Sequence, residues 1–192
     1  MPNKHSSMTS LANQFLVAMP TLDESYFGRS LIYVCEHDDD GAMGLVINKP
    51  TDLSIGHVLS ELNLIDEEEH ELDDKTVLSG GPVHSDRGFI LHNDNKSWSS
   101  SINLSEKISV TTSKDILESL TGESRPERFI MTLGYAGWSA GQLEQELAEN
   151  TWLTLDADPE LIFNTPISKS WEAALQKIGI TVDQLTNFSG HA

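Results

Sequence analysis

The residues best suited to chemistry surround a Gly-Gly-Pro turn. Gly80 and Gly81 precede Pro82, and two successive glycines permit backbone shapes that expose neighbouring N–H groups to an anion. His84 and Arg87 follow within a few residues and can add positive charge. The plainer interpretation is a turn that simply requires glycine, with Arg87 on the surface.

A second polar group follows another predicted strand. Asn48 and Lys49 come directly after the apolar run LVI and precede Pro50. If this strand end lies beside the Gly-Gly-Pro turn, cationic side chains and backbone N–H groups would form a pocket for a carboxylate or phosphate. The predicted ligand-binding residues are Asn48, Lys49, Gly80, Gly81, His84 and Arg87. The alternative is that each cation pairs with a nearby surface acid.

A glycine-rich stretch, FIMTLGYAGWSAGQ at 129–142, has the strand, turn and helix pattern of a phosphate-binding loop. Such loops carry Gly-Lys-Ser or Gly-Lys-Thr at the helix start, whereas no Lys or Arg occurs here between Arg128 and Lys169. The glycines also miss the G-x-G-x-x-G spacing of dinucleotide-binding proteins. We therefore expect no nucleotide phosphate at this stretch.

The same stretch instead predicts a close strand-to-helix corner. The strand would end at Gly134, Gly137 would adopt a conformation that excludes side chains, and Trp138 would fill the core. Ser139 and Gln142 have the spacing of a capping box at the start of the following helix, whose glutamates would point outward.

Cys35 and His37 are two residues apart, which on a regular strand would place them on one face. A thiol and an imidazole can act as nucleophile and base. Side chains at i and i+2 of a strand seldom form a good hydrogen bond, so we favour a small buried Cys35 and a surface His37. One cysteine forms no intramolecular disulfide, and the histidines lack zinc-binding spacing.

Metal and cofactor motifs are otherwise lacking in the sequence. Residues 66–75 (DEEEHELDDK) hold seven acids in ten, but without the ordered spacing and turn glycine of a calcium loop. We expect this stretch to be a solvated loop, and we predict no metal and no cofactor.

The charge of the chain is strongly negative. Its 30 acidic and 12 basic residues give a formal net charge of −18. Because nucleic-acid binding depends on basic groups that displace counterions, direct DNA binding is disfavoured. The N-terminus lacks a signal-peptide core, and no apolar run is long enough to span a membrane, which favours a cytoplasmic protein.

Apolar runs of strand length outnumber helical patterns by about two to one and do not alternate with them regularly, which predicts an α+β fold. The expected strands lie at 14–19, 30–37, 41–50, 76–80, 88–92, 107–112, 128–134, 151–155 and 160–163. The expected helices lie at 54–64, 113–122, 140–150 and 168–179, with a last short one after 181. Asp40-Gly41 is a hairpin signal, so we expect a mixed, mostly antiparallel sheet.

Domain boundaries follow from the same scan. The polar residues 1–10 predict a disordered tail. No repeat or Pro/Gly-rich linker divides the remainder, so residues 11–188 are expected to form a single domain.

Several motifs in order carry a family resemblance. They are NQFLVAMP, CEHDDDGAMGLVINKP, LSGGPV, RGFILH, LGYAGWSAGQLEQEL, NTWL, and LIF followed by W. From about residue 11 to 180 the chain resembles the AlgH/YqgE family of bacterial proteins, apart from the acidic stretch and the N-terminal residues. The resemblance implies a single α+β domain whose sheet is partly curled like a barrel, with about four flanking helices. The resemblance supplies no catalytic residues. The family's name reflects a proposed role in regulating transcription of alginate genes.

Three functions remain open at this point. The leading interpretation is a non-enzymatic cytoplasmic protein that binds a protein partner or a small anionic ligand, with a role in regulation. The second is an enzyme whose dispersed site surrounds the Gly-Gly-Pro turn, since catalytic groups distant in sequence often converge. The third is a transcriptional regulator acting on DNA, which the family name suggests and the charge opposes.

Overall fold

The computed structural model describes residues 9–66, 71–96 and 98–189. The predicted tail therefore lies almost wholly outside the described residues, as does the middle of the acidic stretch, 67–70. From residue 71 that stretch forms a short 3-10 helix, η2 (Glu71–Asp74).

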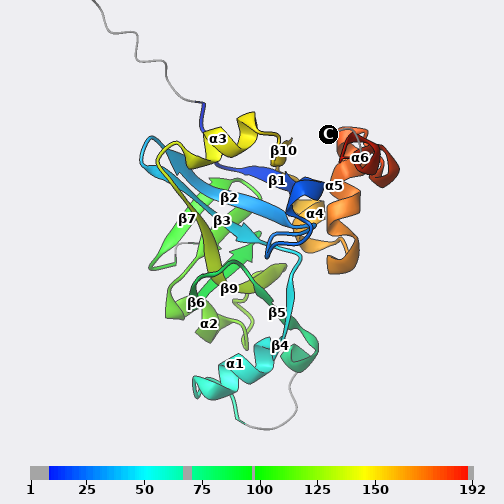
Figure 1. Ribbon diagram of the computed structural model, residues 1–192. Coiled ribbons are helices and arrows are strands. Elements are labelled where there is room, and N and C mark those ends of the chain that lie inside the picture. Colours follow the sequence, from blue (N-terminus) through cyan, green and yellow to red (C-terminus); the bar gives the residue numbers. More distant parts are fainter. Residues whose placement is uncertain (1–8, 67–70, 97, 190–192) are drawn as a thin grey trace, which may run out of the picture.

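One sheet of ten strands organises the fold (Figure 1). The strands are β1 (Gln14–Ala18), β2 (Leu31–Asp38), β3 (Gly41–Val46), β4 (Pro50–Ser54), β5 (Thr76–Ser79), β6 (Val83–His92), β7 (Ser101–Ser105), β8 (Ile108–Thr111), β9 (Phe129–Ser139) and β10 (Trp152–Asp156). Their order is β10-β1-β2-β3-β9-β6-β8-β7, with β4 and β5 attached beside β9. Only the β5–β9 pair is parallel among the described strand pairs.

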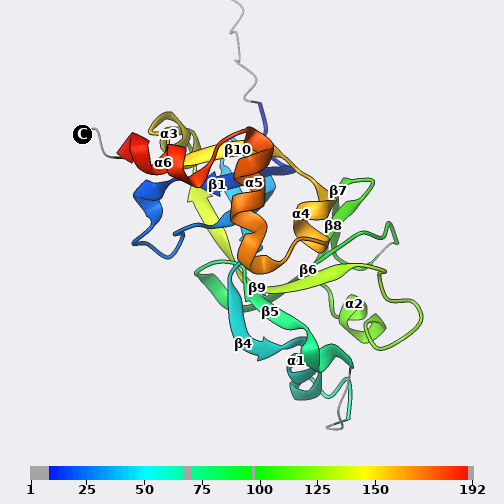
Figure 2. The same ribbon diagram turned by 90° about the vertical axis from the view of Figure 1, so that its right-hand side faces the viewer.

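Six α-helices flank the sheet in the described part of the chain, against five expected from local patterns and about four from the family resemblance (Figures 1 and 2). They are α1 (Ile55–Glu61), α2 (Lys114–Ser119), α3 (Gln142–Ala148), α4 (Pro159–Phe163), α5 (Ser170–Ile178) and α6 (Val182–Ser189). The sheet curls as a half-barrel, with α3 on one side of the β1–β3 region and α4, α5 and α6 on another (Figure 1). The prediction of an α+β fold with a mostly antiparallel, curled sheet is confirmed.

Alternating side chains connect these layers. In β1, Phe15 and Val17 are fully buried in a cluster that includes Trp171 of α5, which we call the α5-side cluster. Their neighbours Leu16 and Ala18 are fully buried on the opposite face with Leu143 of α3, in the α3-side cluster. A third cluster packs α1 and α2 against β5, β6 and β9. Because both faces of β1 are covered, this strand is apolar from Phe15 to Ala18.

Several local signals are confirmed. The predicted β2–β3 hairpin is formed, with Asp39 and Asp40 as its two-residue turn and Gly41 paired with Asp38 at the start of β3. The Ser54 hydroxyl caps α1 by accepting a hydrogen bond from the backbone N–H of His57 at 3.0 Å. Thr181 and Gln184 form the reciprocal capping box that precedes α6.

The predicted corner after Gly134 is wrong, because β9 continues as a strand to Ser139. Its second half pairs with β3, so the residues after Gly134 complete the sheet instead of entering a helix. Gly134 has φ +76° and marks the place where β9 changes partners, whereas Gly137 is outside the left-handed region. Trp138 is buried, as expected.

The start of α3 also differs from the prediction. Gly141, with φ +77°, occupies the capping position. Gln142 accepts from the Ser139 N–H at 3.0 Å, but the Ser139 hydroxyl accepts no bond from the helix, so half of the predicted box is formed.

Two further expectations are corrected. Residues 160–163 form helix α4, not a strand, since Asp158 caps the Glu160 N–H at 3.0 Å and Pro159 occupies the first turn. Strands β4 and β7 lie in segments for which no element was expected. No described helix is both long and apolar enough to cross a membrane.

Candidate functional site

The Gly-Gly-Pro turn packs directly against β9. Gly80 donates its backbone N–H to the Leu133 carbonyl at 2.8 Å and accepts from the Val46 N–H at 2.8 Å. Both polar groups of this glycine therefore serve the sheet. The end of the predicted strand 41–50 does lie beside the turn, because Ser79 donates its N–H to the Lys49 carbonyl at 2.8 Å.

Close backbone contact explains the glycines. A Cβ placed on Gly81 would lie 2.0 Å from the carbonyl carbon of Tyr135. A Cβ on Gly134 would lie 2.4 Å from the Gly81 carbonyl oxygen. The turn and β9 can therefore cross only where both segments have a residue without a side chain. Close packing thus explains glycine at these positions.

Asn48 and Lys49 face the loop that precedes β2. The Asn48 amide accepts from the Leu31 N–H at 2.9 Å and donates to the Arg29 carbonyl at 2.9 Å. The Lys49 ammonium donates to the Tyr26 carbonyl at 2.8 Å and lies 3.2 Å from the centre of the Tyr26 ring. Burial lowers the pKa of this ammonium. Both side chains thus hold the loop to the strand end.

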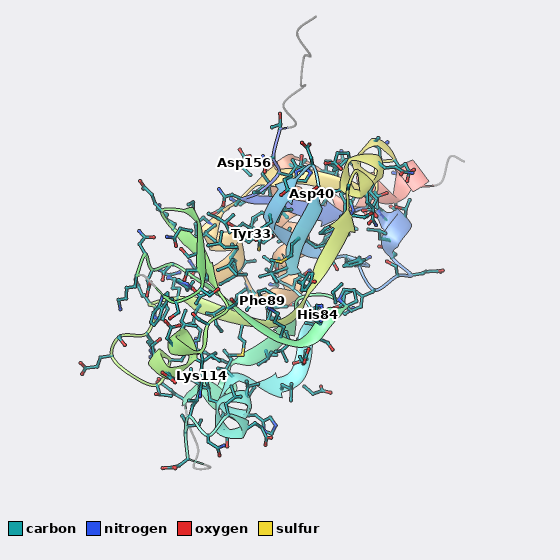
Figure 3. The ribbon with its side chains drawn as sticks, turned by 90° about the vertical axis from the view of Figure 1, so that its left-hand side faces the viewer. Tyr33, Asp40, His84, Phe89, Lys114 and Asp156 are labelled. Carbon is teal, nitrogen blue, oxygen red and sulfur yellow. The ribbon has the colours of Figure 1, made fainter. Side chains whose placement is uncertain are left out.

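His84 and Arg87 belong to the exposed first half of β6. Figure 3 labels His84 and, further along the same strand, Phe89. The His84 ring lies 5.8 Å from the Tyr135 ring, and the Arg87 guanidinium lies 5.5 Å from the Phe89 ring. Arg87 has no carboxylate partner within the described residues.

The anion pocket around the turn stays a prediction. The backbone brings the β3 end and the turn together, but Gly80 and Lys49 already use the groups that would bind an anion. Arg87 keeps an accessible guanidinium, and the prediction now depends chiefly on this residue.

The predicted geometry of Cys35 and His37 is wrong, because β2 contains a β-bulge. The pairing with β3 shifts between Val34 and Glu36, so Cys35 packs in the α5-side cluster while His37 lies opposite Ala42, a residue of the α3-side cluster. Burial, with a smaller contribution from Glu36, raises the pKa of the Cys35 thiol, which opposes thiolate formation.

His37 is buried, not exposed at the strand end as expected. Its Nδ1 accepts from the Leu11 N–H at 2.9 Å, and its Nε2 is hydrogen-bonded to Glu144 of α3. This arrangement ties the first described residues and α3 to the sheet. Sequence spacing gave no sign of it, since the three partners are far apart in the chain.

A mainly apolar cavity in the described part lies elsewhere, between η1 (Pro20–Leu22), the start of β10 and α6. Its volume is about 470 Å³. It is lined by Met19, Pro20, Thr21, Glu149, Asn150, Leu153, Ile180 and Leu185. We call this cavity the α6 groove. Each of its elements was foreseen from local patterns except η1, but no pattern could show that they meet.

Comparisons with known proteins agree on one family. The AlgH-like family model matches residues 15–183. A UPF0301 protein of Vibrio cholerae is 53% identical over 186 residues, which covers 95% of this chain and 100% of that protein. A UPF0301 protein of Pseudoalteromonas translucida is 48% identical, with 96% and 100% coverage.

Solved structures agree with this assignment. The solution structure of the AlgH protein from Pseudomonas aeruginosa has a TM-score of 0.79 and 41% identity, covering 98% of this chain and 100% of that one. A crystal structure of a Corynebacterium diphtheriae protein shares the fold at TM-score 0.67 and 18% identity, with 91% of each chain covered. The chain belongs to the AlgH-like family of bacterial proteins.

Proposed function

We propose that this chain is a non-enzymatic cytoplasmic protein whose α6 groove receives a segment of a protein partner with apolar and positively charged side chains. The observation that carries this proposal is the α6 groove itself. Its volume of about 470 Å³ falls within the range of natural binding pockets, which are concave, mostly apolar and carry a few polar groups.

The walls of the groove favour an apolar occupant. Met19, Leu153, Ile180 and Leu185 supply its apolar surface. Leu185 is buried, while the other three remain partly accessible and pack against the α5-side cluster. A partner side chain placed there would bury apolar surface, which favours binding by about 25 cal/mol per Å².

The surroundings of the groove favour positive charge. Glu149 lines it and forms no ion pair among the described residues. Asp23 and Glu24 follow η1 and are exposed, and Asp183 lies exposed on α6. With a net charge of −18 on the chain, a basic partner would also be steered toward the protein.

The alternatives have less support in the same geometry. An enzyme at the Gly-Gly-Pro turn would need free donors there, whereas the Gly80 N–H and the Lys49 ammonium are bonded within the protein. DNA binding would need a basic face on a chain with 12 basic and 30 acidic residues. A role in transcription would therefore act through a protein partner.

A matched pair of synthetic peptides tests the proposal. One amphipathic helical peptide carries leucine and lysine, and the other carries leucine and glutamate in the same pattern. Fluorescence anisotropy should show binding of the lysine peptide, with Glu149→Lys weakening it by about tenfold because like charges then face each other. Ile180→Glu should weaken it at least as much, with its fold checked by circular dichroism.

A surface charge reversal elsewhere serves as the control. Glu118→Lys on α2 changes net charge equally but lies away from the groove, so it should leave peptide binding within about twofold. Equal binding of both peptides, or equal effects of Glu149→Lys and Glu118→Lys, would refute a specific groove and leave only general attraction to an acidic protein.

A further inference from the structure

We propose that a second site, separate from the α6 groove, binds a small organic anion in a pocket between the β7–β8 turn, the start of β9 and α4. The pocket has a volume of about 250 Å³. It is lined by Asn93, Lys107, Arg128, Pro159, Glu160, Phe163 and Asn164. We call it the Arg128 pocket.

Two cations converge on the Arg128 pocket, which is informative in so acidic a protein. Arg128 and Lys107 belong to different parts of the chain, and neither forms an ion pair within the described residues. Other cations do pair with acids: Lys114 with Glu118, Arg125 with Glu71, and Lys177 with Asp158. The charges of the pocket are therefore left available for a ligand.

Arg128 is held in place for this task. Its backbone N–H donates to the Asn93 side-chain oxygen at 3.0 Å, and its carbonyl accepts from the Asn93 N–H at 3.2 Å. The guanidinium donates to the side-chain oxygen of Asn164 in the opposite wall. A guanidinium has five N–H donors, so several remain to bind a carboxylate or phosphate in a forked geometry.

Lys107 is also positioned by its turn, since its N–H donates to the Ser105 hydroxyl at 3.2 Å. The charge of Lys107 also acts on Asp158, the residue that caps α4. The pKa of Asp158 is lowered chiefly by a hydrogen bond from Lys177, and the charge of Lys107 adds a smaller lowering.

The composition of the walls defines the class of ligand. Arg128 and Lys107 contribute two positive charges and Glu160 one negative charge, so the lining has a net charge of +1. This balance suits a single anionic group more than a highly charged polyphosphate. Phe163 is half-buried and presents an aromatic wall. The fitting ligand therefore carries one carboxylate or phosphate group on a flat or apolar body.

The Arg128 pocket shares no lining residue with the α6 groove and does not include Arg87. The sequence directed attention to cations beside glycines, whereas the Arg128 pocket is formed by a strand start, a turn and a short helix. Nothing in their spacing shows that these elements meet. The groove experiment and the anion experiment use different probes and variants, so either proposal can fail alone.

The test is a titration of the full chain followed by backbone-amide NMR. Benzoate and phenyl phosphate represent the two anion chemistries, benzamide is the neutral match of benzoate, and inorganic phosphate lacks the apolar body. We expect benzoate or phenyl phosphate to shift the amides of Asn93, Arg128 and Phe163 at millimolar concentration, with benzamide at least about tenfold weaker.

Variants assign the effect to the pocket. Arg128→Ala should weaken binding by about tenfold or more, Arg128→Lys by less, and Lys107→Ala by severalfold, because the guanidinium fork and the second charge are lost in turn. Lys114→Ala removes one positive charge on α2, where Lys114 pairs with Glu118 outside the pocket, and should leave binding unchanged, with the amide spectrum confirming each fold. Absence of shifts up to about 10 mM ligand, or equal binding of benzamide, would overturn the proposal. Loss of binding in Arg87→Ala but not in Arg128→Ala would place the anion at the Gly-Gly-Pro turn instead.

Discussion

The two halves of the sheet share β9 but satisfy their polar groups differently. In the half built from β10, β1, β2 and β3, Glu146 of α3 accepts from the indole N–H groups of Trp138 at 2.7 Å and Trp152 at 2.9 Å. Gln142 donates to the other oxygen of Glu146 at 3.2 Å. The prediction that the glutamates of this helical segment point outward is wrong for Glu146 and Glu144, which both bond to groups at the sheet, and is confirmed for the exposed Glu149.

In the half built from β6, β8 and β7, polar groups are buried without complete pairing. His92 is fully buried, and its Nε2 bonds to the Thr111 hydroxyl at 2.7 Å. Its Nδ1 lies 3.7 Å from an Asp94 oxygen and has no hydrogen-bond partner within the described protein atoms. The other Asp94 oxygen and the Trp98 indole nitrogen are unpartnered in the same sense.

The difference teaches which interactions specify each half. The Glu146 carboxylate accepts hydrogen bonds from two buried indole N–H groups and so fixes α3 on its face of the sheet. Removing this carboxylate would leave both buried N–H donors without an acceptor. The other half relies on the apolar cluster of α1, α2 and β9, and some of its buried polar atoms have no protein partner within the described residues. We therefore expect polar substitutions to cost more in the first half.

The largest effect is expected where the halves join. Gly134→Ala should destabilise the fold by about 3 kcal/mol or more, since a left-handed residue with a side chain is strained and the Cβ would overlap the Gly81 carbonyl. Urea unfolding followed by circular dichroism measures the change.

Gly137→Ala is the matched control on the same strand. A Cβ there would be 3.6 Å from the Tyr135 ring, which is an ordinary contact, and the backbone is not left-handed. The control should cost less than about 1 kcal/mol. Equal costs for the two variants would show that the crossing at Gly134 adjusts, and that the halves are not joined rigidly there.

The second effect tests the paired half. Glu146→Ala should cost about 3 kcal/mol, because two buried indole N–H groups lose their acceptor at once. Urea unfolding and near-ultraviolet circular dichroism of the tryptophans measure stability and the indole environment together.

Glu149→Ala provides the comparison on the same helix. Glu149 is exposed and accepts only from the Gln145 side chain among the described hydrogen bonds, so it should cost less than about 0.5 kcal/mol. A small cost for Glu146→Ala would mean that water replaces the carboxylate, and the contrast between the halves would then disappear.

Local patterns predicted the strands and caps well, and the errors have physical causes. Strand β9 continues past Gly134 because its pairing with β3 outweighs the turn tendency of a glycine-rich segment. Helix α4 has an apolar run too short to distinguish helix from strand, although Asp158 and Pro159 form a recognisable helix start. The β-bulge at Cys35 left no periodic signal, so the side of His37 could not be foreseen.

The candidate sites were less accessible to sequence reasoning. Lys49 and Arg87 were grouped because both follow strand patterns near glycines, yet Lys49 lies against Tyr26. Arg128 and Lys107 line one pocket although neither stands in a motif. Binding sites formed by surface contacts between separate elements require the three-dimensional arrangement, which periodicity does not contain.

A smaller effect is expected in the incompletely paired half. His92→Leu should cost less than about 1.5 kcal/mol despite complete burial, because Thr111 keeps a 2.6 Å hydrogen bond to Ser101. Thr111→Val should cost more, since it leaves the imidazole without its bonded partner. If His92→Leu costs as much as Glu146→Ala under the same urea protocol, the two halves do not differ as we infer.

The smallest expected effect is a pH dependence that belongs to His92. Burial lowers its pKa from the ordinary value of 6.5, against a smaller raising influence of Asp94. The unfolded chain therefore binds this proton at a higher pH than the folded protein, and stability is complete above pH 6.5 and declines as the pH falls toward the folded pKa. The carboxylates of Asp115, Glu144 and Asp158 do not interfere with this effect. Their pKa values are lowered from about 4, so the stability that they contribute is lost only in stronger acid.

Urea unfolding at about pH 7.5 and about pH 5.5 measures the pH dependence. The free energy of unfolding of the parent protein should fall between these two pH values, and it should fall less in His92→Leu. Parallel losses in the two proteins would show that His92 is protonated as readily in the folded state as in the unfolded one, and that its half of the sheet admits water to the ring.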